Sequence, residues 1–215
     1  VAKNTAMKYL LEQGCEHIFI MEDDVLLQTD EVFDKYIKTS IYTGIKHFNY
    51  ALQGPANKKG AQGFSTLDER AKQENLSEPN PRQIIKYGEG VEVALYPNCV
   101  GAFSYYHKDV LEDVGFFDEF YRNAWEHVDH TMMTYRKGYT TPYWWFADIN
   151  ESWKYIKDIE GCIENSTIGH TPEWHKNFNN GSIHFKQKHG FGPTQVPDTN
   201  PQQLQKVLNK LYQNR

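Results

Sequence analysis

The feature that most constrains this chain is a short apolar run that leads into three consecutive acids, HIFIMEDD at positions 17 to 24. The HIFIM part suits a buried strand of a parallel sheet, because such strands are covered on both faces. Glu22, Asp23 and Asp24 follow at once, and three adjacent carboxylates repel one another unless water or a cation separates them. The stretch therefore predicts a core strand that ends either in a solvated acidic turn or in a cation site.

Helical and strand-like segments alternate along the rest of the chain. Apolar periodicity predicts helices at 2–13, after Thr29 or Asp30, at 107–114, at 126–137 and from Pro201 onward, and strands at 45–52, 91–97, 101–106 and 139–149. Residues 53 to 90 and 160 to 195 are interpreted as loop-rich. This alternation favours an α/β fold with a mostly parallel, Rossmann-like sheet. Ligands of such sheets bind at the carboxyl ends of strands, where the three acids stand.

Composition excludes several classes of function. The chain of 215 residues, most consistent with a single domain, has a net charge of −5 and no concentrated basic face, so nucleic acid is not an expected partner. No apolar stretch is long enough for a transmembrane helix, and no stretch has the pattern of a secretory signal peptide. Cys15, Cys99 and Cys162 lack metal-type spacing and are expected to be reduced thiols, which indicates a cytoplasmic protein.

The acidic turn is the first candidate site. Residues at i and i+2 of an extended segment point to the same side, so Glu22 and Asp24 could share a ligand while Asp23 points elsewhere. Mn²⁺ and Mg²⁺ prefer such carboxylate oxygens, and Mg²⁺ leaves most of its coordination to water and substrate phosphates. The alternative is a solvated turn, or acids that cap the following helix. A single histidine could complete a metal site, and His170, His175, His184 and His189 are the candidates, although a surface or core role is the expected one for any of them.

The second candidate site is the segment WEHVDH at positions 125 to 130. A helix that begins near Glu126 places Glu126, Asp129 and His130 on one side, with His127 beside them. A carboxylate or imidazole at a helix start next to a tryptophan is a plausible general base. The competing interpretation is that the acids only favour the positive end of the helix dipole.

Three segments taken together resemble the GT-A-fold glycosyltransferases of family 2, the nucleotide-sugar-dependent enzymes that build bacterial polysaccharides. The helix, strand and acidic motif of VAKNTAMKYLLEQGCEHIFIMEDDV are similar to the family's D-x-D region. The stretch NCVGAFSYYHKDVLEDVGFFDEFY resembles the part in which a Gly-Ala pair lines the sugar site, and WEHVDHTMMTYRKGY resembles the Glu-Asp motif helix. HFKQKHG resembles a run near the end of several members, so that the resemblance covers residues 1 to 192.

This resemblance implies a GT-A-like sheet and a specific set of roles. Asp24, helped by Glu22 and by His170 or His184, would bind Mn²⁺ or Mg²⁺. The donor, first of all a UDP-sugar, would lie near Asp23, Asp24, Gly101 and Ala102. A base among Glu126, His127 and Asp129 would activate a hydroxyl of a glycan acceptor, with inversion at the sugar. Peripheral association with the inner face of the membrane would also fit the family.

Two departures from the family pattern keep alternatives open. The chain has Glu126-His127 where the family commonly has Glu-Asp, and the family's first strand–helix–strand unit would precede Val1. Residues 1–195 are accordingly expected to form a glycosyltransferase domain without that unit, and 196–215 a C-terminal amphipathic helix packed on it. A carbohydrate-binding or catalytically inactive module is the main alternative. A metal-dependent phosphoryl-transfer or hydrolytic enzyme would explain the acids but not the other two segments.

Overall fold

The computed structural model describes residues 2–62, 69, 72–73, 75–166, 169, 171–195 and 200–215. The helices in this part of the chain are α1 (Ala2–Glu12), α2 (Glu31–Thr43), α4 (Lys108–Val114), α5 (Glu126–Lys137), α6 (Pro172–His189) and α7 (Pro201–Gln213), with a 3-10 turn η1 (Ser152–Lys154). The strands are β1 (His17–Met21), β2 (Val25–Leu27), β3 (His47–Asn49), β4 (Gln83–Lys86), β5 (Glu92–Tyr96), β6 (Phe103–His107), β7 (Phe146–Ile149) and β8 (Ile156–Asp158).

The strands form three small sheets, in the orders β1-β6-β3, β2-β8 and β4-β5-β7. Each strand pairing in these sheets is antiparallel. The prediction of a mostly parallel, GT-A-like (Rossmann-like) sheet is therefore wrong. The reason is that β6, which arrives late in the sequence, lies between β1 and β3 and runs opposite to both. A helix–strand alternation in sequence does not determine which strands become neighbours.

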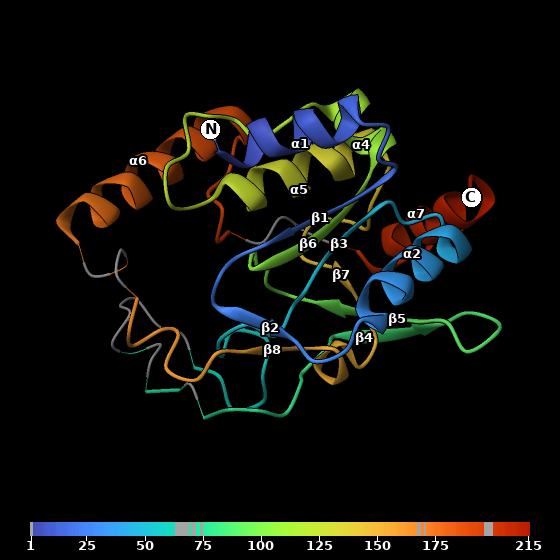
Figure 1. The fold of residues 1–215 in the computed structure, drawn as a ribbon, viewed down its shortest axis with the longest axis horizontal. Coiled ribbons are helices and arrows are strands. Elements are labelled where there is room, and N and C mark those ends of the chain that lie inside the picture. Colours follow the sequence, from blue (N-terminus) through green and yellow to red (C-terminus); the bar gives the residue numbers. More distant parts are fainter. Residues whose placement is uncertain are drawn as a thin grey trace.

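The sheet β1-β6-β3 is covered on both faces. Successive side chains of a strand point to opposite faces, so each strand contributes to two different core clusters. Phe103 and Tyr105 of β6 face the core shared with α2 and α7, whereas Tyr106 faces α1 and α4. Figure 1 shows the corresponding layers, with α1, α4, α5 and α6 grouped over one side and α2 and α7 over the other. Apolar residues on both faces explain why HIFIM lacks the polar–apolar alternation of a half-exposed strand.

The C-terminal helix α7 packs onto the main core. Its buried side chains Leu204, Leu208 and Leu211 recur at helical spacing and belong to the same cluster as Tyr36 of α2. Asn200 caps the helix by accepting a hydrogen bond from the backbone N–H of Gln202. None of the helices in the described ranges combines the length and the apolar character needed to cross a membrane.

Candidate active site

The antiparallel pairing of β1 with β6 assembles the candidate site. The carboxyl end of β1 lies beside the start of β6, since Met21 pairs with Phe103. The backbone N–H of Glu22 continues the ladder and donates to the carbonyl of Ala102 at 2.8 Å. The acidic turn and the Gly101–Ala102 segment are therefore neighbours through a backbone hydrogen bond, and this placement requires the antiparallel direction of β6.

The first turn of α5 joins this cluster through a lysine. The Lys3 ammonium at the start of α1 lies 3.0 Å from Oε1 of Glu22 and 3.2 Å from Oε1 of Glu126. The same oxygen of Glu126 lies 3.8 Å from Nδ1 of His127. Three segments that are far apart in sequence thus meet within the reach of one lysine side chain.

Gly101 is the contact between β6 and the His127 ring. A Cβ added to Gly101 would lie 2.6 Å from both Cγ and Nδ1 of His127, a distance that side chains do not tolerate. The imidazole therefore packs directly on the glycine backbone. With 22 % of its side chain exposed, His127 is held in place and is still accessible to a ligand.

Charge neighbours determine how each carboxylate behaves. Burial would raise the pKa of Glu126, but the neighbouring His127 ring and the Lys3 ammonium hold it well below its usual range. Burial, together with the charges of Glu22, Asp158 and Asp23, instead raises the pKa of Asp24. Burial would lower the pKa of the Lys3 ammonium, but the carboxylates of Glu126 and Glu22 raise it above its usual value.

The two carboxylate oxygens of Asp24 differ in their hydrogen bonding. Its Oδ2 accepts a hydrogen bond from Nε2 of Gln53 at 2.6 Å, whereas its Oδ1 is buried and has no hydrogen-bond partner within the described ranges. Among the described residues no group of three or more His, Cys, Asp and Glu side chains is arranged to hold a metal ion. A divalent cation at this turn would have one carboxylate from Asp24 and would need most of its other ligands from water and phosphate, as Mg²⁺ commonly does.

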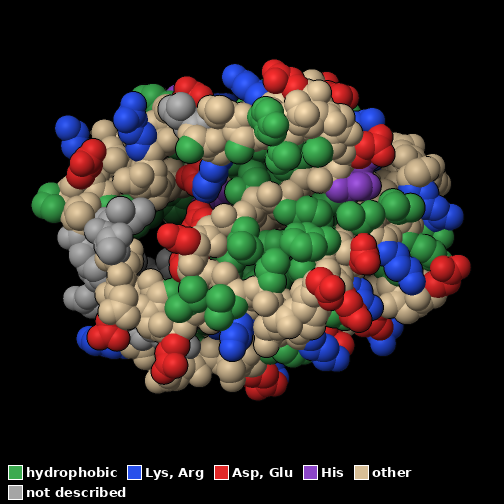
Figure 2. Space-filling view, in the orientation of Figure 1, with side chains coloured by type: hydrophobic (Ala, Val, Ile, Leu, Met, Phe, Trp, Pro, Cys, Tyr) green, Lys and Arg blue, Asp and Glu red, His purple; other side chains and the backbone are tan. Residues whose placement is uncertain are grey.

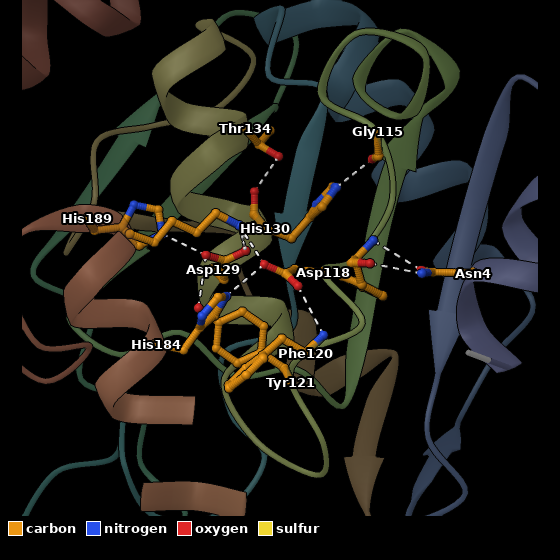
Figure 3. Close-up of polar contacts among 12 residues, drawn as sticks. Asn4, Gly115, Asp118, Phe120, Tyr121, Asp129, His130, Thr134, His184 and His189 are labelled. Carbon is orange, nitrogen blue, oxygen red and sulfur yellow. Dashed lines mark hydrogen bonds and ion pairs between the residues drawn. The ribbon is translucent and has the colours of Figure 1, made fainter. Parts of the chain in front are cut away.

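Asp129 lies in a different environment from Glu126. It is buried, and its carboxylate accepts hydrogen bonds from His189 at 2.6 Å, Lys188 at 2.8 Å and the Tyr121 hydroxyl at 3.1 Å. These partners hold the pKa of Asp129 below its usual value in spite of burial. Figure 3 shows Asp129 in a network that joins α5 to α6. We conclude that Asp129 connects α5 to α6 through these hydrogen bonds, and that its carboxylate is not available as a general base.

Of the two histidines proposed as metal ligands, the structure describes His184, whose contacts lie with Asp118 and Phe120 and not with the acidic turn. Nε2 of His184 contacts Oδ2 of Asp118 at 3.0 Å, and its ring stacks on Phe120 at 4.0 Å between centroids (Figure 3). His184 thus belongs to the α5–α6 network. His170 lies outside the described residues.

Trp125 forms the side of the site toward α6. Its backbone is left-handed, with φ at +74°, a conformation that costs a bulky residue about 1–3 kcal/mol. Its indole N–H donates to the carbonyl of Phe178 at 3.0 Å, and Gly181 of α6 leaves room for the ring, since a Cβ there would lie 2.9 Å from it. The strain and the close packing fix the point at which α5 begins.

Half-buried aromatic rings continue from Trp125 along α6. Trp125 and Phe178 have ring centroids 4.7 Å apart, and Trp174 stacks on Phe178 at 5.1 Å. We call these three rings the aromatic shelf.

Figure 2 shows acidic side chains at the margin of a hollow on the side of the molecule where β1 runs into β2. Two other pockets of the described surface lie away from this cluster, one between α5 and α7 and one beside α2.

Lys3, Gln53 and the shelf residues Trp174 and Phe178 were not predicted from the sequence. Lys3 has a usable signal, because a lysine in the first turn of a helix opposes the helix dipole and needs a nearby acid.

Comparison of the chain with protein-family models, curated proteins and solved structures finds no match.

Proposed function

We propose that this chain transfers a sugar from a nucleotide-sugar donor, with UDP-sugars as the first candidates, to a hydroxyl of a glycan acceptor. The observation that carries the proposal is the meeting of the acidic turn, the Gly101 segment and the Glu126–His127 pair around Lys3. Each of these segments resembles a different motif of the same enzyme class. Their convergence supports a shared role that no single motif could support.

The chemistry assigns one step to each residue. In the transfer, a bond forms between the acceptor oxygen and the anomeric carbon of the donor sugar, while the bond from that carbon to the diphosphate oxygen breaks. His127 accepts the proton of the attacking hydroxyl, and one displacement inverts the configuration. Asp24, with Glu22 near it, would hold Mn²⁺ or Mg²⁺, and the bound ion would supply Lewis-acid stabilisation of the departing diphosphate.

The aromatic shelf provides a surface for the acceptor. The C–H faces of sugar rings stack on aromatic rings, and Trp125 and Trp174 combine an apolar body with a polar N–H group. The shelf begins at the residue before Glu126, so a glycan bound along it would present a hydroxyl near His127.

The proposal predicts a specific effect of Asp24→Asn. Neutralising Asp24 removes the charge that attracts a cation while it preserves the side-chain shape, so UDP release from UDP-sugars in the presence of Mn²⁺ should fall by about a hundredfold, the size seen when one electrostatic group of an active site is lost. The matched control is Asp34→Asn, an exposed acid in the first turn of α2. Full turnover in Asp24→Asn would overturn the role of Asp24.

A carbohydrate-binding module without transfer is the second candidate, and the aromatic shelf favours it. The two functions differ in their need for the acids. Calorimetric titration with chitotetraose and with UDP, each with and without Mn²⁺, separates them. Binding of the oligosaccharide without metal, together with no UDP binding and no turnover, would favour the module.

A further inference from the structure

Lys3 occupies an unfavourable place in its own helix. It lies in the first turn of α1, where the positive end of the helix dipole disfavours a cation. The first turn of α1 contains no acid to offset it. The compensation comes from outside the helix, from the carboxylates of Glu22 and Glu126.

The neighbouring residue fixes the direction of Lys3. The Asn4 side chain is buried, donates to the carbonyl of Phe117 at 2.9 Å and accepts from its backbone N–H at 3.0 Å. The Asn4 amide also donates to the carboxylate of Glu119 at 3.0 Å. This clamp attaches the first turn of α1 to the chain that leads into α5, while the Lys3 ammonium lies 5.9 Å from the Phe117 ring centroid.

We infer that Lys3 is a positioning residue, whose ammonium joins the acidic turn to the first turn of α5 and thereby holds the Glu126 carboxylate against His127. The part of this inference that concerns turnover rests on the proposed function. Lys3 itself does not need to touch the substrate. It acts through Glu126, which orients the imidazole that packs on Gly101.

The charged and titratable groups around this bridge come from four elements. Glu22 and Asp24 of the acidic turn repel each other, and Glu126 and His127 of α5 attract each other. Within the described residues, His47 on β3, Cys99 before β6 and Tyr106 on β6 also interact electrostatically with Glu126 or His127. Burial keeps these three side chains neutral at pH 7, since it lowers the pKa of His47 to about 3 and raises the pKa of Cys99 to about 12 and that of Tyr106 well above its usual value. In the described structure Lys3 is therefore the cation that directly contacts the carboxylates of Glu22 and Glu126.

The bridge can be tested without any enzyme assay. In protein labelled with ¹³C at lysine Cε, the titration of Lys3 is followed by NMR in the wild type, Glu22→Gln, Glu126→Gln and the double variant. We expect each single change to lower the pKa of Lys3, and the double change to bring it below the ordinary lysine value, because burial is then unopposed. Lys8 of the same helix, which lies over the Phe116 ring, is the internal control and should not move. An unchanged Lys3 titration in both single variants would overturn the bridge.

The positioning role is tested by turnover with UDP-sugar and Mn²⁺. Lys3→Met should lower kcat by about tenfold to a hundredfold with little change in the KM for the donor, the effect of a displaced catalytic group. Lys3→Arg, which can still span two carboxylates, should recover most of the loss, and Lys8→Met should behave as the wild type. Normal kcat in Lys3→Met, or equal losses in the Met and Arg variants, would overturn the inference. Absence of turnover in the wild type would refute the proposed function and, with it, the catalytic part of this inference, while the NMR titration still decides the bridge.

Discussion

Replacement of His127 by alanine is expected to lower kcat for sugar transfer by about a hundredfold to ten-thousandfold, the range that a general base usually contributes. Three residues of α5 were candidates for the base, and their contacts separate them. Asp129 is buried and accepts three hydrogen bonds, and the Glu126 carboxylate is paired with Lys3 and His127. A carboxylate whose pKa is held low is a weak base, so the proton of the acceptor hydroxyl goes to His127.

A series of α5 variants distinguishes His127 from its neighbours. Glu126→Gln should lose less activity than His127→Ala, because it removes the group that orients the ring but leaves the ring in place. Unfolding by urea should show that His127→Ala retains most of its stability, since the ring is partly exposed and its loss leaves no buried donor unpaired. If Glu126→Gln abolishes transfer and His127→Ala does not, Glu126 is the base.

Most of the local elements could be predicted from the sequence. Helix α5 begins at Glu126 and ends at Lys137, as its apolar periodicity and the following Gly138 predict. Strand β1 coincides with HIFIM, and α1, α2, α4 and α7 occur where capping residues and apolar spacing place them. These features depend on residues within one or two turns of each other, which a single sequence contains in full.

The features that were predicted wrongly depend on contacts between distant segments. The region from 160 to 195 was expected to be loop-rich, yet α6 extends over 18 residues. Its body contains Asn179, Asn180 and Gly181, which are poor helix formers. Gly181 is nevertheless favourable there because Trp125 packs directly against it. The usable signals were at the ends of α6, where Thr171 caps the helix, Pro172 begins it and Gly190 follows it.

The proximity of the motifs depends on the strand direction that the sequence did not reveal. The acids follow β1, whereas Gly101 precedes β6, so only an antiparallel β6 places Gly101 beside them. In the predicted parallel sheet the two segments would lie at opposite edges. Lys3 has a local signal, a cation in the first turn of a helix, but its partners Glu22 and Glu126 come from segments that no local pattern connects to it.

The largest expected effect on stability comes from Asp148→Ala, a change in the core of the sheet β4-β5-β7. Asp148 is fully buried and accepts hydrogen bonds from the Tyr36 hydroxyl at 2.5 Å, the Ser152 hydroxyl at 2.7 Å and the backbone N–H of Ala51 at 2.9 Å. It thereby connects β7 to α2 and to the chain after β3. The backbone N–H of Ile149 also donates to this carboxylate, at 2.8 Å. Alanine would leave these four donors without the carboxylate, at about 1–3 kcal/mol for each that stays unpaired, so the free energy of unfolding should fall by about 3–5 kcal/mol.

The pH dependence of that loss gives a second check, and its sign follows from the direction of the pKa change. Burial raises the pKa of Asp148 to about 6, from 3.8. The folded state therefore holds a proton that the unfolded state has released, and stability from Asp148 is present at low pH and is lost as the pH rises through 6. The alanine variant lacks this dependence, so the loss of unfolding free energy should be about 1 kcal/mol larger at pH 5 than at pH 7.5.

Urea denaturation of wild type and Asp148→Ala at the two pH values measures both effects. Asp113→Ala is the control, because the ion pair of Asp113 with Lys137 at 2.9 Å is exposed and should contribute less than about 1 kcal/mol. A loss of similar small size for Asp148→Ala would show that the buried donors find other partners. If the loss is instead larger at pH 7.5 than at pH 5, the hydrogen-bond donors around Asp148 stabilise its ionised form by more than burial destabilises that form.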